Sequence, residues 1–287
     1  MEKKLLILAA VVFVFSCTLR AADLQVPKEA PANSAMTVGT SGEGSGTLYI
    51  VGPVLRLKRS VRLGEAVSLE PEEVRAAGVY TAVLRAGGSA VSRSFVIVPA
   101  RVERMSFLAQ PSRVPANARD AISGTVFVMD RADNLVLTPV PVDFALGIEG
   151  FPADRRTVNT HDGLAWTRMD SSRRSGNAQF TAASANVSVK RIVQQVAAEP
   201  CNLRFHARPA KSGILVETDP VRDCAGNAVP DGMIVTFTDV DPLGKSTVDA
   251  VVKKGIAQAM LPAAPRATIS VAAGVVVGNE IRWGGER

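Results

Sequence analysis

Histidine is the side chain that most readily exchanges a proton near neutral pH, and the sequence offers two, His161 and His206. His161 begins the run His161-Asp162-Gly163, whose composition is typical of a turn before a strand. His206 lies in a sequence pattern that occurs twice in the chain, and the other copy has Leu108 at the same position. Because that position is filled elsewhere without histidine, we predict no catalytic or metal-binding role for either imidazole.

The loops that expose a nucleophile or hold a phosphate are also missing. No Gly-x-Ser-x-Gly elbow is present, so the strained turn that exposes a catalytic serine is absent from the sequence. Gly42, Gly44 and Gly46 lack the spacing, the lysine and the following helix of a phosphate-binding loop. Glu103 and the glutamates of residues 70–73 have no positioned partner for acid–base work. The sequence therefore predicts a protein that is not an enzyme and has no cofactor.

Three aspartates, Asp219, Asp223 and Asp231, lie close together in the sequence. Exported β-sandwich domains can bind calcium between their turns through aspartate and carbonyl oxygens. Aspartate is equally common in turns for its own sake, because its carboxylate accepts backbone hydrogen bonds. We predict turns here and no metal site. Zinc is a weaker alternative, since the available cysteines and histidines are widely spaced.

The N-terminus has the pattern of an export signal. Two lysines precede an apolar run over residues 5–15, which is too short to span a bilayer. Residues 14–17, with the sequence VFSC, resemble a bacterial lipobox, which would make Cys17 the lipidated first residue of the mature chain, although Phe15 replaces the usual small residue. Cleavage after Ala21 is the alternative. Both interpretations place the mature protein in the periplasm, the outer membrane or the cell surface.

Cys201 and Cys224 are the cysteines that remain once Cys17 carries lipid or leaves with the signal. In an oxidising compartment the two can pair. Closing a loop of this length would stabilise the fold by about 3 kcal/mol in the chain-entropy description. We therefore predict a disulfide between Cys201 and Cys224.

The charge distribution limits the class of partner. The formal net charge is +6, but the positive residues are scattered, and pairs such as Arg155-Arg156 and Arg173-Arg174 have no aromatic residues between them. A nucleic-acid surface needs a clustered basic patch, so we expect no nucleic-acid partner. Attraction to anionic envelope polysaccharide or lipid headgroups fits this distribution better.

An internal repeat organises the second and third parts of the chain. The pattern Phe-x-Ala-x-Pro occurs at residues 107–111 and again at residues 205–209. Further landmarks keep their mutual spacing in the two copies, in which Asp130, Asn134, Val136, Val142 and Phe144 match Asp223, Asn227, Val229, Val235 and Phe237. Repetition at this spacing predicts two domains of about 95 residues each.

Strands are the expected elements within each copy. Ile214, Val216 and Thr218 alternate with other residues, as in a strand with one buried face. Many such runs, separated by Gly, Pro, Asn and Asp, predict an antiparallel β-sandwich, with at most one short helical turn near residues 70–77. Trp166 shares a face with Leu164 and is expected to pack inward, the alternative being an exposed tryptophan that anchors a partner.

The stretch CAGNAVPDGMIVTF, residues 224–237, links turns to a core strand. Its predicted turn residues are Asp223, Gly226, Asn227, Pro230 and Gly232. A strand then runs to residue 238 with its apolar side chains inward. This run resembles the immunoglobulin-like domains of bacterial surface proteins of the invasin and intimin type. The resemblance implies an all-β fold of tandem immunoglobulin-like antiparallel β-sandwiches.

The domain division follows from the repeat and the resemblance. We expect an export signal over residues 1–22 and three sandwiches over residues 23–100, 101–196 and 197–287. The first lacks the repeated motif, but its end looks like the closing hairpin of another immunoglobulin-like sandwich.

These observations predict a non-catalytic exported protein of the cell envelope, a binding or spacer module for adhesion. The alternative is an accessory subunit of an envelope assembly, such as a secretion or pilus-related apparatus. The expected partners are envelope or surface proteins or polysaccharide, and the membrane itself through a lipid anchor on Cys17.

Overall fold

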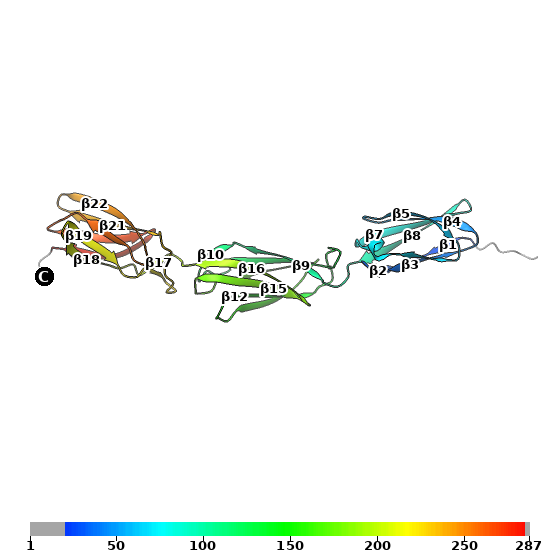
Figure 1. Cartoon of the computed structure of the whole chain (residues 1–287), viewed down its shortest axis with the longest axis horizontal. Helices are drawn as coiled ribbons and strands as arrows, with labels where there is room; N and C mark the ends of the chain where they lie inside the picture. The colour runs from blue at the N-terminus through cyan, green and yellow to red at the C-terminus, as the bar shows by residue number, and fades with distance from the viewer. Residues whose placement is uncertain (1–20, 285–287) are drawn as a thin grey trace, which may run out of the picture. The chain divides into compact units, whose positions relative to one another are not determined.

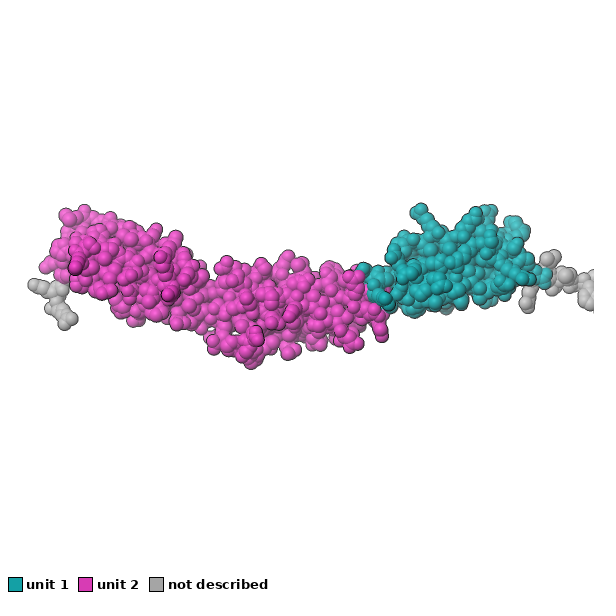
Figure 2. All heavy atoms as spheres, viewed as in Figure 1, with its two compact units in different colours: residues 1–100, 131–134 teal, residues 101–130, 135–287 magenta. Residues whose placement is uncertain are grey.

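The computed structural model describes residues 21–284, so the predicted export signal and Cys17 lie outside the described residues. These residues hold three separate hydrophobic cores, and nearly all their regular structure is strand. Their contacts divide the chain into two compact units, residues 1–100 with 131–134, and residues 101–130 with 135–287 (Figure 2). The all-β class is confirmed, and the division into three domains stays a prediction. No helix among residues 21–284 is long and apolar enough to cross a membrane.

The first unit is a sandwich of two sheets (Figure 1). Its strands are β1 (Asp23–Gln25), β2 (Glu29–Pro31), β3 (Met36–Ser41), β4 (Ser45–Val51), β5 (Arg56–Arg62), β6 (Ala66–Leu69), β7 (Gly78–Ala86) and β8 (Ser89–Val98). One sheet has the order β2-β8-β7-β4-β5 and the other the order β1-β3-β6. Tyr80 and Phe95 stack in the core with ring centroids 5.4 Å apart. A single 3-10 turn, η1 (Pro71–Val74), confirms the expected short helical turn.

The second sandwich repeats this arrangement within the second unit. Its strands are β9 (Arg104–Gln110), β10 (Arg113–Pro115), β11 (Ile122–Met129), β12 (Pro141–Ile148), β13 (Asp154–Asn159), β14 (Leu164–Met169), β15 (Gly176–Ser184) and β16 (Val187–Val196). The sheets have the orders β10-β16-β15-β12-β13 and β14-β11-β9. Phe107, Phe144 and Phe180 meet in the core, and the Phe107 and Phe180 rings lie edge to face at 5.1 Å. Gly124 faces them, because a Cβ there would lie 2.6 Å from the Phe180 ring.

The third sandwich has a core of the same kind, but its first strand is only two residues long. Its strands are β17 (Pro200–Cys201), β18 (Phe205–Ala210), β19 (Gly213–Thr218), β20 (Arg222–Asp223), β21 (Ile234–Asp241), β22 (Gly244–Val251), β23 (Gln258–Leu261), β24 (Ala267–Ala273) and β25 (Val276–Trp283). The sheets have the orders β22-β21-β24-β25, β18-β19-β23 and β17-β20. Val235 and Phe237 are fully buried, as the alternating run predicted.

The second strand of a sandwich pairs with its last strand in two of the three cases. β2 runs parallel to β8, and β10 runs parallel to β16. Both pairings continue beyond the strands, since the N–H of Ala32 donates to the carbonyl of Val98 and that of Ala116 to the carbonyl of Val196. In the third sandwich the described strands pair in antiparallel fashion throughout.

The prediction that Trp166 packs inward is wrong. The alternation along β14 turns Ala165, Thr167 and Met169 into the core and leaves Trp166 59% exposed. The physical reason is space: the core of this sandwich is already filled by three phenylalanine rings, and small or flexible residues of β14 complete it. Sequence alternation identifies two faces but not which of them is buried.

Candidate functional site

The turn after β20 is organised by one buried carboxylate. Asp223 is 4% exposed, and its Oδ1 accepts hydrogen bonds from the N–H groups of Ala225 at 2.9 Å and Asn227 at 2.8 Å. Its Oδ2 accepts from the N–H of Ala198 at 3.1 Å and from Nδ2 of Asn227 at 2.9 Å. The carboxylate thus joins the segment that leads into the third sandwich, here called the entry segment, to the turn after β20.

The same contacts set the protonation of this group. Burial alone would raise the pKa of Asp223, but the hydrogen bonds from Asn227, Ala198 and Ala225 outweigh it and leave the pKa below its ordinary value. Asp223 is therefore a carboxylate at neutral pH and is fully used as a hydrogen-bond acceptor. It has a structural role, and nothing in its surroundings equips it to transfer a proton.

Asn227 connects this turn to the loop before β15. Its Oδ1 accepts from the N–H of Ser175 at 2.9 Å, and its Nδ2 donates to the carbonyl of Arg173 at 2.8 Å. In the first unit, Asn134 makes the equivalent pair of contacts, with the N–H of Ala77 and the carbonyl of Arg75, both at 2.8 Å. The repeat matches these two asparagines by spacing. It does not predict their partners, which lie more than fifty residues away in the sequence.

Replacing Asn227 by alanine is expected to open the segment around Arg173. Two hydrogen bonds that hold residues 173–175 are lost, so trypsin should cleave after Arg173 and Arg174 about tenfold faster. Early cleavage products, identified by mass spectrometry, measure this rate. Asn177→Ala is the matched control, because Asn177 is exposed and nearby on β15. Equal cleavage rates in the two variants would contradict the assigned role of Asn227.

The remaining predicted turn residues are Gly226, Pro230 and Gly232. Gly226 and Gly232 have positive φ angles of 88° and 92°, which glycine adopts without strain. Pro230 and Gly232 belong to a second turn, in which Oδ1 of Asp231 accepts from the N–H of Lys254 at 2.8 Å. Between the two turns, residues 222 and 228 form a single β-bridge.

The predicted disulfide is present. Cys201 and Cys224 are joined with a Cα–Cα distance of 4.9 Å. The bond lies next to Asp223 in the sequence, so a covalent and a hydrogen-bonded tie hold the same entry segment. Cys224 is exposed, which leaves the bond accessible to a reductant.

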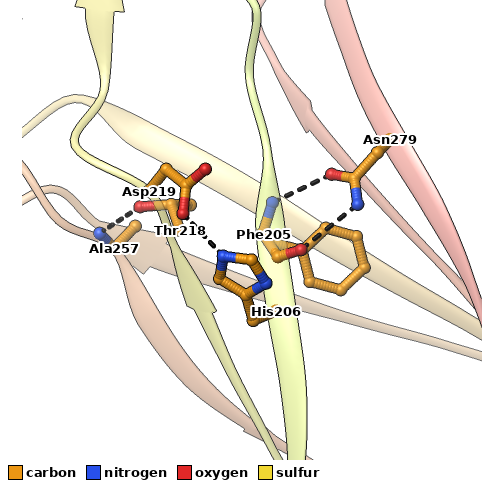
Figure 3. A network of polar contacts seen from close by, with 6 residues as sticks. All are labelled: Phe205, His206, Thr218, Asp219, Ala257 and Asn279. Atoms are coloured by element: carbon orange, nitrogen blue, oxygen red, sulfur yellow. Dashed lines mark hydrogen bonds and ion pairs between the residues drawn. The ribbon is translucent and has the colours of Figure 1, made fainter.

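The two histidines lie at the surface, each beside an aspartate. Nε2 of His206 is 2.7 Å from Oδ1 of Asp219, and the neighbouring Asn279 bridges the backbone of Phe205 (Figure 3). His161 contacts Asp162 at 3.1 Å and is almost fully exposed. Within the described part of the chain, no three His, Cys, Asp or Glu side chains converge on a point that could hold a metal ion.

An exposed apolar row crosses the outer face of the sheet β14-β11-β9. Leu108, Thr125 and Trp166 lie opposite one another in register on the three strands. Leu108 is 54% exposed and Phe127, two residues further along β11, is 41% exposed. Tryptophan is enriched among the residues that contribute most to protein–protein binding, so this outward face is a candidate contact surface. We call these residues, with Trp166 at one edge, the Trp166 row.

Comparisons with known proteins bear on this arrangement. No family model matches the chain, and no curated protein matches its sequence. Among solved structures, the chain is similar to FdeC, an Escherichia coli adhesin, with a TM-score of 0.58 and 11% identity over 92% of this chain and 96% of that one. InvD of Yersinia pseudotuberculosis gives a TM-score of 0.53 and 12% identity over 93% of this chain and 98% of that one.

Invasin, a bacterial integrin-binding protein, gives a TM-score of 0.51 and 14% identity over 91% of this chain. The match spans 59% of the invasin chain. Identities this low establish the fold. The chain therefore has the fold of the tandem immunoglobulin-like domains of bacterial adhesins, and the resemblance inferred from the motif at residues 223–237 is confirmed at that level.

Proposed function

We propose that the chain is a non-catalytic, exported binding protein of the bacterial envelope, in which three immunoglobulin-like domains present an adhesive surface. The domains correspond to residues 23–100, 101–196 and 197–287, and the lipidated Cys17 would tether them to a membrane. The single observation that carries the proposal is the Trp166 row, which leaves a tryptophan 59% exposed in a chain with few aromatic residues. Similarity in fold to adhesins supports the same conclusion. A surface protein or polysaccharide would be the ligand.

A second candidate function is an accessory subunit of an envelope assembly. β13 and β22 each pair with a neighbour on one side only among the described strands. Such edges can accept a strand from a partner protein. This candidate differs from the adhesin in predicting partners inside the envelope, shielded from the medium.

A photo-reactive amino acid at position 166 tests both candidates in living cells. We expect cross-links from position 166 to a protein or polysaccharide outside the cell, because the Trp166 row is the proposed contact surface. The same amino acid at position 79, an exposed valine on β7, is the control, because β7 has a paired strand on both sides. Cross-links confined to envelope proteins, with the chain protected from external protease, would favour the accessory subunit. No cross-link from position 166 above the level of position 79 would refute binding through this row.

A further inference from the structure

A polar row runs beside the Trp166 row on the same sheet. Gln110, Ser123 and Arg168 lie opposite one another on β9, β11 and β14, two residues along each strand from Trp166 and the residues opposite it. Residues two apart on a strand point to the same face and lie about 7 Å apart. The outer face of this sheet therefore presents an apolar row and a polar row side by side.

The polar row borders a hollow at the same end of the sheet. Its volume is about 780 Å³, within the range of ligand-binding pockets, and Leu108 of the apolar row forms part of its lining. Gln110, Ser123 and Arg168 line it as well, and Asp120 joins them from the segment before β11. The hollow thus brings apolar surface and several hydrogen-bonding side chains together.

The polar side chains of the hollow are available to a ligand. Asp120, Arg168 and Gln110 are exposed, and within residues 21–284 neither Asp120 nor Arg168 forms an ion pair. The Ser123 hydroxyl donates to the carbonyl of Gln110 at 3.1 Å, so its oxygen can still accept a hydrogen bond. The lining therefore offers donors from the guanidinium, acceptors from the carboxylate, and both from the amide of Gln110.

The charge of the lining does not select an ion. One lining residue is acidic, Asp120, and one is basic, Arg168, so their formal charges cancel. Asp170 lies close by, since its Oδ1 accepts from the N–H of Asp120 at 2.8 Å, but it does not line the hollow. An anion and a cation would each meet a group of their own sign. A neutral ligand that both donates and accepts hydrogen bonds complements this lining best.

The third sandwich shows that the fold does not require the apolar row. By the alignment of the two repeats and the register of the strands, the equivalent row there consists of His206, Glu217 and Gln258. His206 and Gln258 are exposed, as Trp166 is. Because the same three strands pair with polar side chains at these positions, packing of the sandwich does not account for the exposed tryptophan.

An exposed indole beside available polar groups suits a sugar ring. The face of an indole carries a partial negative charge, and the C–H groups on the face of a sugar are slightly positive, so the two pack together. The hydroxyls of a sugar lie around the edge of its ring, and each of them can donate and accept a hydrogen bond. A ring packed on Trp166 would direct its edge towards the polar row, about 7 Å away.

We propose that the Trp166 row and the adjoining hollow bind a neutral oligosaccharide. One sugar ring packs on Trp166, with Leu108 extending the apolar surface, and hydroxyls of this ring and the next bond to Arg168, Asp120 and Gln110. A protein partner fits less well, because its surface presents polar groups singly, whereas the hollow places a donor, an acceptor and an amide together. The inference rests on the proposed binding function and names the chemical class of ligand at the same surface.

A glycan array of neutral and acidic oligosaccharides, probed with the mature protein, tests the class of ligand. We expect saturable binding to neutral oligosaccharides. Their sialylated or sulfated forms should bind more weakly, because the added charge meets the carboxylate of Asp120 in the same hollow. Calorimetric titration of the neutral oligosaccharide that binds most strongly on the array then gives the dissociation constant for each protein variant.

Variants of the tryptophan test the apolar half of the site. Trp166→Ala should raise the dissociation constant about thirtyfold, and Trp166→Phe should raise it less, because phenylalanine keeps an aromatic face. Gln258→Ala, at the equivalent position of the third sandwich, should change it less than about twofold. Trp166 is exposed, so we expect both of its variants to fold, and their denaturant unfolding curves check this.

Variants of the two charged residues test the polar half. Arg168→Gln and Asp120→Asn should each raise the dissociation constant for the neutral oligosaccharide about tenfold, because each removes a charged hydrogen-bonding partner. Asp120→Asn should also bring binding of the sulfated form closer to that of the neutral form, and Arg168→Gln should move the two further apart. Arg208→Gln, an exposed arginine on β18, is the control and should have less than about a twofold effect.

Three results would overturn the proposal: an array without any bound oligosaccharide, a preference for the acidic forms, or equal dissociation constants for Trp166→Ala and Gln258→Ala. The cross-linking at position 166 separates this inference from the proposed function. Cross-links to a surface protein, together with an array without binding, would remove the sugar site alone. Array binding that depends on Trp166, without cross-links from position 166 in cells, would retain the sugar site and remove its adhesive use.

Discussion

Asp223→Ala is expected to lower the free energy of unfolding of the third sandwich by about 3 kcal/mol. The variant leaves the N–H groups of Ala198, Ala225 and Asn227 without their acceptor, and it also frees the Asn227 side chain. Denaturant unfolding of the exported protein, followed by a probe in this sandwich, measures the loss. The first unit should unfold at an unchanged denaturant concentration.

The matched control is Asp231→Ala. Asp231 accepts a single backbone hydrogen bond, from Lys254, at an exposed position, so its loss should cost less than about 1 kcal/mol. Similar losses in the two variants would contradict a special role for Asp223.

The effect of Asp223 depends on pH with a definite sign. Its folded-state pKa lies below the ordinary value of 3.8, so its stabilisation is fully present above that pH. As the pH falls through the lowered pKa, the carboxylate gains a proton and the contribution is lost. The difference in stability between wild type and Asp223→Ala should therefore shrink only below about pH 4.

Removing the disulfide is expected to have an effect of similar size. The combined variant Cys201→Ala and Cys224→Ala should lose about 3 kcal/mol, because the unfolded chain regains the freedom of a loop with a sequence separation of 23 residues. Denaturant unfolding measures the loss, and wild-type protein treated with a reductant should match the double variant. Two free thiols in the exported wild-type protein would refute the predicted pairing.

The losses in the free energy of unfolding caused by removing Asp223 and by removing the disulfide should not be additive. Asp223 and the Cys201–Cys224 bond hold the same entry segment of the third sandwich, so once one is removed the other has less to stabilise. The triple variant is expected to lose less than the sum of the separate losses. Full additivity would show that the two contacts act on independent parts of the sandwich.

Local patterns in the sequence were sufficient to predict the all-β fold. Alternation placed Val235 and Phe237 in the core, and the repeat identified Asp223 and Asn227 as equivalent to Asp130 and Asn134. These features depend on neighbours within one strand or one turn, where spacing determines which side chains share a face.

Features set by distant segments could not be predicted. Trp166 points outward because phenylalanines from other strands fill the core. Gln195 resembles an ordinary polar residue of β16, and it is buried by contact with the loop at Ser172. The Asn227 contacts likewise require the position of residues 173–175, which no local pattern encodes.

The parallel pairing of the second and last strands has a mechanical consequence. Once the preceding strand, β1 or β9, has been pulled from its sheet, tension between the two ends of a sandwich acts on β2 and β8 in the first and on β10 and β16 in the second. Because each pair is parallel, the pull slides one strand along the other and loads all the hydrogen bonds between them together, whereas bonds at the end of an antiparallel pair can open one after another. The third sandwich has no such pair among its described strands, and its entry is fastened by a covalent bond. A tether between a cell and a surface in flowing liquid would draw on this resistance to tension.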